Sequence, residues 1–414
     1  MLKIDWKNCR ADDGFTGERK RIIFTGDWVP EWDAKTVLPY AELLKKEPVG
    51  CYGDVLQLLQ SADLRVVNLE CVLDPEGCPP ARKGGPHLFA RKEHLPALQA
   101  GGFDVATLAN NHTMDFGAEG YLRTKSILEK FGIKSFGAGM DDCEAWKPLI
   151  LDIGGIRLGM VCFTEGHDLA AAAPCKPGTA GWEIERACAT VRGLRKTCDI
   201  VIAIGHAGIE FTAHPSKYCV EAFRRVAVER PDAIIGHHPH VPQGFEIYGG
   251  VPIFYSLGNF LFHMGTKVLH RRHGYLVELE ISKSGVHGFT LHPYDICDTG
   301  LRLLKGAARK EFCALIKRVS RPFEPGEELY AGFNAALREH WTNGYPSRHF
   351  ALVMKALEED PMRAAVLLRN RLTVLQHLGL YLPMCERVLE GKIDDVEPWA
   401  AEIEHEYMKR KIDD

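Results

Sequence analysis

The sequence predicts an α/β protein with a mostly parallel or mixed sheet covered by helices, followed by a helical C-terminal extension. Between about residues 20 and 300, short β-branched runs alternate with amphipathic segments, which is the pattern of strands connected by helices. From about residue 301 to 414 the apolar residues recur with helical spacing and no obvious strand pattern is present. We therefore expect two parts, residues 1–300 and 301–414, with the boundary near residues 298–325.

Each expected element follows from the spacing of its apolar residues. Val- and Ile-rich runs predict strands at residues 21–25, 64–68, 105–108, 149–153, 158–163, 200–204, 233–235, 253–256, 274–281 and 288–293. Helical spacing predicts helices at residues 55–60, 94–100, 118–131, 183–196 and 217–229. In the C-terminal extension the helices are expected at residues 305–319, 329–340, 348–359, 361–378 and 398–411.

Composition narrows the possible classes of function. Hydrophobic residues make up 46% and charged residues 26% of the chain, which is ordinary for a globular protein. The formal net charge of −4 argues against a dedicated nucleic-acid binder, because such proteins usually carry a basic excess. We therefore expect no nucleic-acid partner, and the oligomeric state is left open.

Cysteine usage and hydropathy predict a cytoplasmic protein. The 13 cysteines are odd in number and form no Cys-x-x-Cys pair, which indicates free thiols in a reducing compartment. The first residues lack the apolar core of a signal peptide. No run approaches the roughly 18 apolar residues of a membrane span.

Polar groups that can bind metal follow several of the expected strands. The densest group is Gly-His-His-Pro-His, which places three imidazoles in four residues directly after the apolar run 233–235. Open α/β sheets build their sites at the carboxyl ends of strands, where neighbouring strand ends lie about 4.8 Å apart. The candidate ligand-type residues at these ends are Asp27, Asn68, Glu70, Asn110, Asn111, His112, Asp115, His206, His237, His238 and His240.

Mixed nitrogen and oxygen donors of this kind suit Mn, Fe or Zn better than Ca or Mg. Each motif alone has an ordinary explanation: Gly26-Asp27 is a common turn, Asn110-Asn111 can cap a helix, and His206 can be a buried core histidine. No structural rule requires such residues after five of the expected strands, however, so the ordered series favours a metal site. The proline- and glycine-rich segment 74–86 is expected to be a loop near it.

These motifs together resemble the CapA family of bacterial capsule and poly-γ-glutamate synthesis proteins, which is similar in turn to calcineurin-like metallophosphoesterases. The resemblance covers about residues 20–265 and does not include the region beyond 300. The motifs that carry it are Gly26-Asp27, Asn68-Leu69-Glu70, Asn110-Asn111-His112 with Asp115 and Gly117, His206-Ala207-Gly208-Ile209-Glu210, Gly236-His237-His238-Pro239-His240 and Ser256-Leu257-Gly258-Asn259-Phe260.

The resemblance implies a four-layer α/β/β/α sandwich with a centre of two divalent transition-metal ions, Mn, Zn or Fe. Asp27 would bind the first metal, Glu70 would bridge both, and His240 would return to the first. The second metal would be bound by Asn111, His206 and His238. His112 would face the leaving group, oriented by Asp115. The residues expected to contact substrate are Asn68, Asn110, His237 and Asn259.

The chain also departs from the phosphoesterase pattern. Asp27-Trp28-Val29 stands where phosphoesterases have Asp-x-His, so one imidazole is absent, and the bridging acid is Glu70 rather than an Asp. The Gly-His-His-Pro-His spacing leaves the roles of His237 and His238 open to exchange. The first metal is therefore expected to be weakly held or to need substrate for completion.

The expected function is a metal-dependent hydrolase acting on a phosphoester or on a γ-glutamyl or other amide bond. Its substrate would be a small molecule or a polyanion carrying γ-glutamyl or phosphate groups. The basic residues near the motifs can either receive such a substrate or form a solvated surface: Arg82, Lys83, Arg91, Lys92, Arg271 and Arg272.

The alternative function is a non-catalytic accessory protein of a capsule or poly-γ-glutamate assembly complex. Members of such complexes usually carry an N-terminal anchor, and its absence here favours the free-standing enzyme. The C-terminal helices are expected to cap the sheet, with a lid over the site or a dimer interface as the other possibilities.

Overall fold

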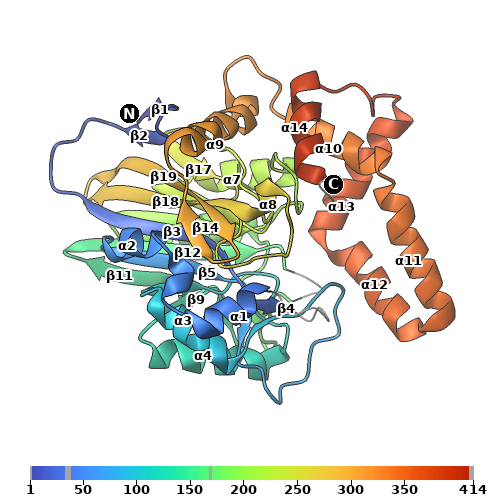
Figure 1. Ribbon diagram of the computed structural model, residues 1–414, viewed down its shortest axis with the longest axis horizontal. Coiled ribbons are helices and arrows are strands. Elements are labelled where there is room, and N and C mark those ends of the chain that lie inside the picture. The colour runs from blue at the N-terminus through green and yellow to red at the C-terminus, as the bar shows by residue number, and fades with distance from the viewer. Residues whose placement is uncertain (1, 33–38, 167–169, 410–414) are drawn as a thin grey trace.

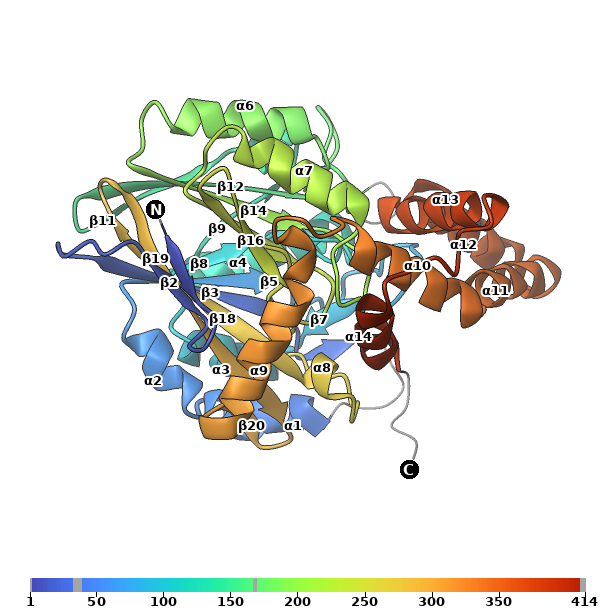
Figure 2. The same ribbon diagram turned by 90° about the horizontal axis from the view of Figure 1, so that it is seen from above.

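The computed structural model describes residues 2–32, 39–166 and 170–409. Two β-sheets face each other in the middle of the molecule, and helices lie outside both of them (Figures 1 and 2). This arrangement confirms the four-layer α/β/β/α architecture. Each strand expected between residues 20 and 300 corresponds to a strand of one of these two sheets.

The first sheet has a parallel half and an antiparallel half. Its strand order is β1-β2-β19-β18-β3-β5-β8-β9, and β20 pairs with β19. The pairs β3/β5, β5/β8 and β8/β9 are parallel, so these strands end at the same edge of the sheet. The strands are β1 (Lys3–Asp5), β2 (Arg10–Asp12), β3 (Lys20–Trp28), β5 (Leu64–Leu69), β8 (Val105–Thr107), β9 (Lys134–Phe136), β18 (His273–Ser282), β19 (Gly285–Cys297) and β20 (Gly300–Leu303).

The second sheet has the order β11-β12-β14-β15-β17-β16, in which β12, β14, β15 and β17 are parallel neighbours. Its strands are β11 (Leu149–Ile153), β12 (Ile156–Thr164), β14 (Ile200–His206), β15 (Ala233–His237), β16 (Phe245–Tyr248) and β17 (Val251–Phe254). Smaller pairings involve β4 (Glu31–Trp32), β6 (Val72–Leu73), β7 (Leu88–Ala90), β10 (Ala138–Gly139) and β13 (Gly178–Thr179).

Side chains that point to opposite faces of the strands divide the hydrophobic core into two layers. In β3, Ile22 and Phe24 belong to the core between the sheets, whereas Ile23 packs with the helices on the outer face. Successive side chains of a strand point to opposite faces, so a strand that is apolar at every position must be covered on both sides. The continuous apolar runs in the sequence therefore correspond to strands with a sheet on one face and helices on the other.

Helices α1 to α4 cover the outer face of the first sheet, and α6 and α7 cover the second (Figure 2). Their bounds are α1 (Pro39–Lys46), α2 (Val55–Gln60), α3 (Leu95–Ala100), α4 (Gly117–Lys130), α6 (Ile184–Leu194) and α7 (Lys217–Ala227). The remaining short helices of this part are η1 (Gly50–Tyr52), η2 (Lys92–His94), α5 (Asp142–Ala145) and α8 (Leu269–Arg272).

The C-terminal helices occupy two places. Helix α9 packs on the sheet through Phe312, whose ring lies 6.2 Å from that of His273 and 6.1 Å from that of Tyr275. The later helices form a group at one end of the molecule (Figure 1). The helices are α9 (Gly306–Val319), η3 (Arg321–Phe323), α10 (Ala331–Thr342), α11 (Tyr345–Glu359), α12 (Pro361–Thr373), α13 (Leu375–Leu389) and α14 (Pro398–Met408).

Two sequence predictions for this region are wrong in detail. The single helix expected at 361–378 is two helices, because Val374 takes an extended conformation (φ −81°, ψ 123°) between α12 and α13. Strand β20 also carries the sheet to Leu303, past the expected start of the helical part. The division into domains at residues 300 and 301 stays a prediction, and the last residues of the helix expected at 398–411 lie outside the described residues.

All 13 cysteines lie in the described residues and carry free thiols, as the sequence predicts. Among the described residues, every helix is too short or too polar to cross a membrane.

Candidate metal centre

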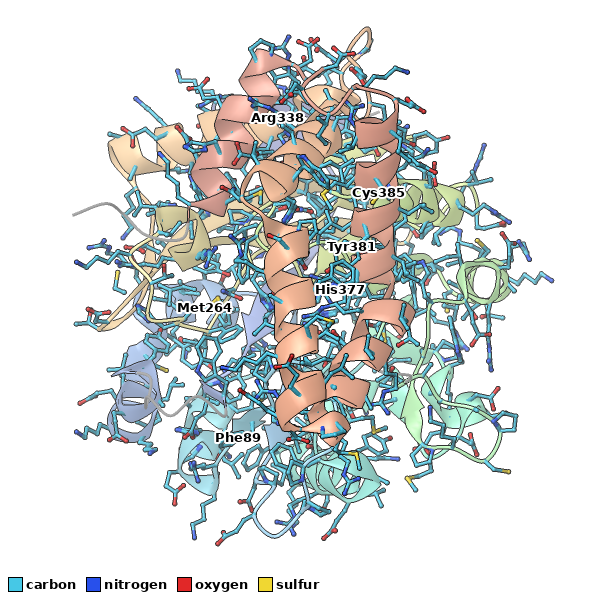
Figure 3. The ribbon with its side chains drawn as sticks, turned by 90° about the vertical axis from the view of Figure 1, so that its right-hand side faces the viewer. Phe89, Met264, Arg338, His377, Tyr381 and Cys385 are labelled. Carbon is cyan, nitrogen blue, oxygen red and sulfur yellow. The ribbon has the colours of Figure 1, made fainter. Side chains whose placement is uncertain are left out.

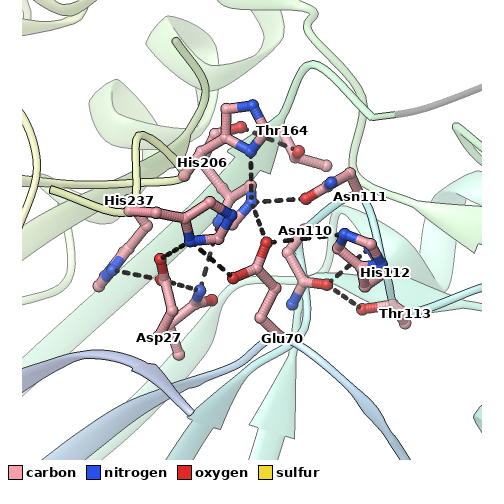
Figure 4. Close-up of polar contacts among 12 residues, drawn as sticks. Asp27, Glu70, Asn110, Asn111, His112, Thr113, Thr164, His206 and His237 are labelled. Carbon is pink, nitrogen blue, oxygen red and sulfur yellow. Dashed lines mark hydrogen bonds and ion pairs between the residues drawn. The ribbon is translucent and has the colours of Figure 1, made fainter. Parts of the chain in front are cut away.

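The candidate ligands meet at the edge where the parallel strands of both sheets end (Figure 4). Asp27 lies near the end of β3 and Glu70 directly follows β5, both in the first sheet. His206 and His237 end β14 and β15 of the second sheet. The strand ends therefore converge here, and the two sheets that carry them are those of the four-layer sandwich that the resemblance implies.

Glycines allow the backbone to approach the site closely. A Cβ on Gly26 would lie 2.0 Å from the carbonyl oxygen of Gly258, so only glycine fits before Asp27. This contact places the turn that contains Asn259 against Asp27, and the two residues form an isolated parallel bridge. Asn259 Oδ1 then lies 2.9 Å from His240 Nδ1.

The histidine-rich segment after β15 is conformationally strained. His238 has a φ of 101° and His240 a φ of 59°, values that side chains other than glycine rarely adopt. Each such residue costs on the order of 1–3 kcal/mol and persists when its surroundings require it. Both imidazoles here offer a ligand atom within 4.8 Å of one of Glu70.

Four side chains that can bind metal lie close together at His206. Its Nε2 lies 2.7 Å from Asn111 Oδ1, 3.2 Å from His238 Nδ1 and 3.3 Å from Glu70 Oε1. All four side chains are buried. The resemblance assigns Asn111, His206 and His238 to the second metal and Glu70 to both.

A second set of donors surrounds Asp27. Its Oδ2 lies 3.3 Å from His240 Nδ1, which is 3.8 Å from Glu70 Oε2. Its Oδ1 lies 3.3 Å from His237 Nδ1, so an imidazole from β15 contacts Asp27 although the Asp-x-His imidazole is absent. Of the two histidines whose roles were open to exchange, His237 is therefore at Asp27 and His238 is at His206.

The electrostatics of this cluster fit a cation. Burial and the nearby charge of Asp27 raise the pKa of Glu70 well above its usual value. Burial opposes ionisation of Asp27 as well, but the nearby imidazoles of His237 and His240 hold its pKa well below the usual range. Burial likewise disfavours the charged form of His240, yet Glu70 and Asp27 raise its pKa to about 10.

Several atoms of the cluster also lack hydrogen-bond partners. They are Asp27 Oδ2, both carboxylate oxygens of Glu70, and His237 Nδ1. Burying unpaired polar atoms is costly unless a bound ion or another partner compensates. Burial lowers the pKa of His206 and of His238, which favours the neutral imidazole that binds metal.

His112 forms a separate hydrogen-bonded unit beside the cluster. Its Nδ1 lies 2.7 Å from Asp115 Oδ2, and its Nε2 lies 4.0 Å from Glu70 Oε1. Lys83 donates to Asp115, and its Nζ lies 3.1 Å from His112 Nδ1. Burial, assisted by Lys83, lowers the pKa of His112 to about 4 despite the attraction of Asp115.

The amides of Asn68 and Asn110 are occupied by protein groups. Asn68 Nδ2 donates to Asp27 Oδ1 at 2.7 Å and lies 3.2 Å from His206 Nδ1. Asn110 donates to the carbonyl of Leu69 and accepts from the backbone N–H of His112. These contacts favour a positioning role for both residues, and the expected contact with substrate stays a prediction.

The basic residues named from the sequence have different surroundings. Lys83 is buried in its pair with Asp115, Arg91 pairs with Glu31, and Arg272 pairs with Asp295. Arg271 lines the cavity described below, stacked over Phe211 with its guanidinium 4.0 Å from the ring centroid. Of these four residues, Arg271 is the one that lines the cavity beside the cluster.

Two side chains at the site were missed in the sequence. The buried carboxylate of Glu165 lies 3.4 Å from His238 Nε2, and burial raises its pKa to about 8. Glu165 directly follows β12, so the strand-end pattern could have identified it. Gln376 Oε1 lies 3.3 Å from the same His238 nitrogen and comes from α13, where no motif announces it.

The C-terminal helices form part of the wall of a cavity of about 530 Å³ that opens onto the site. His112 and His240 line it from the α/β part, whereas Tyr345, Arg371 and His377 line it from the helices. Figure 3 faces these helices and labels His377 and Tyr381 on α13. The expectation of a simple cap on the sheet is therefore met by α9, while α10 to α13 lie beside the site.

Comparison with known proteins agrees with this picture. Residues 21–264 match the family described as "Bacterial capsule synthesis protein PGA_cap". The chain is 32% identical to the PGA biosynthesis protein CapA of Bacillus subtilis (strain 168) over 212 residues, which cover 51% of this chain and 55% of that protein. It is 34% identical to the capsule biosynthesis protein CapA of Bacillus anthracis over 188 residues, covering 43% of this chain and 45% of that protein.

The chain thus spans about half the length of these curated relatives. A solved 5'-nucleotidase from Candida albicans SC5314 aligns with a TM-score of 0.41 at 12% identity, covering 75% of this chain and 60% of that one. The family match takes in more than half of the 414 residues. The protein belongs to the bacterial capsule synthesis protein PGA_cap family.

Proposed function

We propose that the protein is a metal-dependent hydrolase with a binuclear centre of divalent transition metals, Mn, Zn or Fe. One observation carries the proposal: two buried carboxylates, Asp27 and Glu70, lie among four buried imidazoles, and carboxylate oxygens are left without a hydrogen-bond partner. Buried acids in such surroundings require compensating positive charge. Three of the donors, Glu70, His238 and His240, offer ligand atoms within 4.8 Å of one another.

The contacts suggest how the ligands divide. Asp27, His237 and His240 would hold the first ion, Asn111, His206 and His238 the second, and Glu70 both. His237 would then replace the imidazole that the Asp27-Trp28-Val29 motif lacks, which differs from the substrate-contacting role expected from the resemblance. Ions bound there would supply Lewis acidity and acidify water near neutral pH.

His112 is proposed as the general acid that protonates the leaving group, oriented by Asp115. Its Nδ1 is held by Asp115, so the Nε2 atom faces the cluster. With a pKa near 4 the free imidazole is neutral at pH 7, and an anionic substrate beside it would raise that pKa. His112 would therefore become an effective acid only in the complex with an anionic substrate.

The substrate class we propose is an anion containing a phosphoester or a γ-glutamyl or other amide bond. Both bonds are cleaved by activated water and a Lewis acid, and the named relatives act in capsule and PGA biosynthesis. We place this activity in the cytoplasm, where the free thiols would stay reduced. The competing possibility is an accessory protein without catalysis.

Metal content separates these possibilities. Elemental mass spectrometry on protein purified without an affinity metal, beside His238→Ala, should find about two transition-metal ions per chain and a loss in the variant. Turnover of a panel of phosphoesters and γ-glutamyl amides should then depend on those ions. Protein that stays metal-free on titration, or turnover that survives in His238→Ala and Asp27→Ala, would favour the accessory role.

A further inference from the structure

The connection between α12 and α13 brings C-terminal residues into the site. Gln376 contacts His238, and the adjacent His377 lines the same cavity as His112 and His240. On the other side of Val374, Arg371 also lines this cavity. The family match ends at residue 264, so this wall belongs to the part of the chain that the match does not reach.

The guanidinium of Arg371 is oriented but not neutralised. Its Nη1 donates to Asn370 Oδ1 and to His377 Nε2, the latter at 2.8 Å. Its Nε is buried and has no hydrogen-bond partner. Among the described residues no carboxylate pairs with Arg371, and burial keeps His377 neutral by lowering its pKa to about 3.

The neighbours of Arg371 hold it in place. Asn370 is buried, and its Oδ1 lies 2.9 Å from His377 Nε2. A Cβ on Gly84 would lie 2.7 Å from Asn370 Cγ, so the loop 74–86 packs directly against this amide. The Arg371 side chain is therefore held by Asn370 and His377, and the loop of the α/β part packs against Asn370.

The cavity is lined by further positive charge. Arg271 lines it from α8, and Arg348 lines it from α11. Among the described residues that line the cavity, Glu210 is the one carboxylate. A cavity of about 530 Å³ is large enough for a ligand that reaches from the metal cluster to the helices.

We infer that Arg371, together with Arg271 of α8, forms an anion-binding subsite that holds an oxyanion group of the substrate away from the bond that is cleaved. A guanidinium fork binds a carboxylate or a phosphate through two parallel hydrogen bonds, and a partly buried arginine without a counter-charge leaves that position open. The inference deepens the proposed hydrolase function and rests on it for the identity of the reacting end. With this subsite, the C-terminal helices would select substrates by their charge.

Ligand binding by the metal-free full-length protein tests this subsite without relying on turnover. Isothermal titration after dialysis against EDTA would use γ-linked triglutamate, its neutral triamide and inorganic phosphate. The variants are Arg371→Met, which removes the charge, and Arg371→Lys, which keeps the charge without the fork. Arg363→Met is the matched control, because Arg363 is exposed on the same helix.

We expect Arg371→Met to weaken binding of an anion by about 10- to 100-fold and Arg371→Lys by less, with Arg363→Met unchanged. A loss confined to triglutamate identifies a carboxylate subsite, and a loss confined to phosphate identifies a phosphate subsite. Equal affinity in wild type and Arg371→Met, binding of the triamide as tight as that of triglutamate, or no anion binding by the wild type overturns the inference. If Arg371→Met does not fold by circular dichroism, the comparison of wild type with Arg371→Lys decides.

The anion-binding subsite and the proposed hydrolase function can be refuted separately. Anion binding through Arg371 in a protein that never takes up metal would retain the subsite and refute the hydrolase. Two bound ions with no contribution from Arg371 would retain the hydrolase and refute the subsite.

Discussion

Replacing Glu70 with Gln should weaken metal binding while stabilising the metal-free protein. Glu70 is fully buried, its pKa is raised by burial and by Asp27, and neither of its oxygens has a hydrogen-bond partner. The amide keeps the shape of the side chain and removes its charge. The two effects have opposite signs because the same carboxylate is unfavourable without an ion and favourable with one.

The expected size follows from the burial of Glu70. Leaving a buried polar group unsatisfied costs about 1–3 kcal/mol, and the amide removes part of this cost, so we expect a gain of about 1–2 kcal/mol in EDTA. Unfolding entropy is about 0.9 kcal/mol/K for a chain of 414 residues, so this gain raises Tm by about 1–2 °C. Metal at 100 times its Kd adds about 2.7 kcal/mol to wild type, or about 3 °C, and Glu70→Gln should lose most of this shift.

Glu246→Gln is the matched control. Glu246 is also buried, but Arg224 donates to both of its oxygens at 2.9 and 2.7 Å and Tyr255 donates at 2.6 Å. Removing one partner of such a pair leaves an uncompensated buried charge. This variant should therefore unfold at a lower temperature than wild type and retain the metal-induced shift.

Thermal unfolding of the three proteins, followed by circular dichroism in EDTA and then with Mn²⁺ or Zn²⁺, measures both effects. If Glu70→Gln were destabilised as strongly as Glu246→Gln in EDTA, the carboxylate of Glu70 would have a stabilising partner in the metal-free protein, and the reasoning would be refuted. If it kept the full metal-induced rise in Tm, Glu70 would not be a ligand.

Three further predictions use the same structure. His238→Ala should lose bound metal, measured by elemental mass spectrometry, and full retention would exclude His238 as a ligand. His112→Ala should keep its metal and lower kcat by about 10²- to 10⁴-fold on the best substrate found; an unchanged kcat would remove it from catalysis. Burial lowers the pKa of His94 to about 4, so between pH 6.5 and 4 the unfolded chain binds more protons and stability falls as the pH falls, by up to about 3 kcal/mol. His94→Asn can still accept from the backbone N–H of Arg91 and should flatten urea-denaturation midpoints over this pH range, whereas an unchanged slope would contradict the assignment.

The sequence could predict the strands and their terminal ligands because both follow from local patterns. An apolar run that ends in Asp27, Glu70 or His206 specifies a buried strand and a polar group at its end. Which sheet each strand joins depends on pairing between distant segments, and the motifs alone did not predict that the ends belong to two sheets. Glu165 shows the limit of the rule as applied, since it also directly follows a strand and was not identified.

The contribution of the C-terminal helices could not be predicted in this way. Gln376 lies 138 residues from His238 in sequence, and a lone glutamine in an apolar helix has no local signature of a site. The helix periodicity runs through Val374 without interruption, so the break that turns Arg371 and Gln376 toward the cavity was not visible. Tertiary packing decides both features.

The origin of the ligands in two facing sheets has a mechanical consequence. Asp27 and Glu70 extend from one sheet, and His206 and His238 extend from the other. The contacts in the apolar layer between the sheets are non-directional, so they do not by themselves fix how one sheet lies on the other. Ions held by both sets of ligands would fix the position and the orientation of one sheet relative to the other. Metal loading should then slow amide exchange in strands far from the ions, with the greatest change in those that pack across the interface.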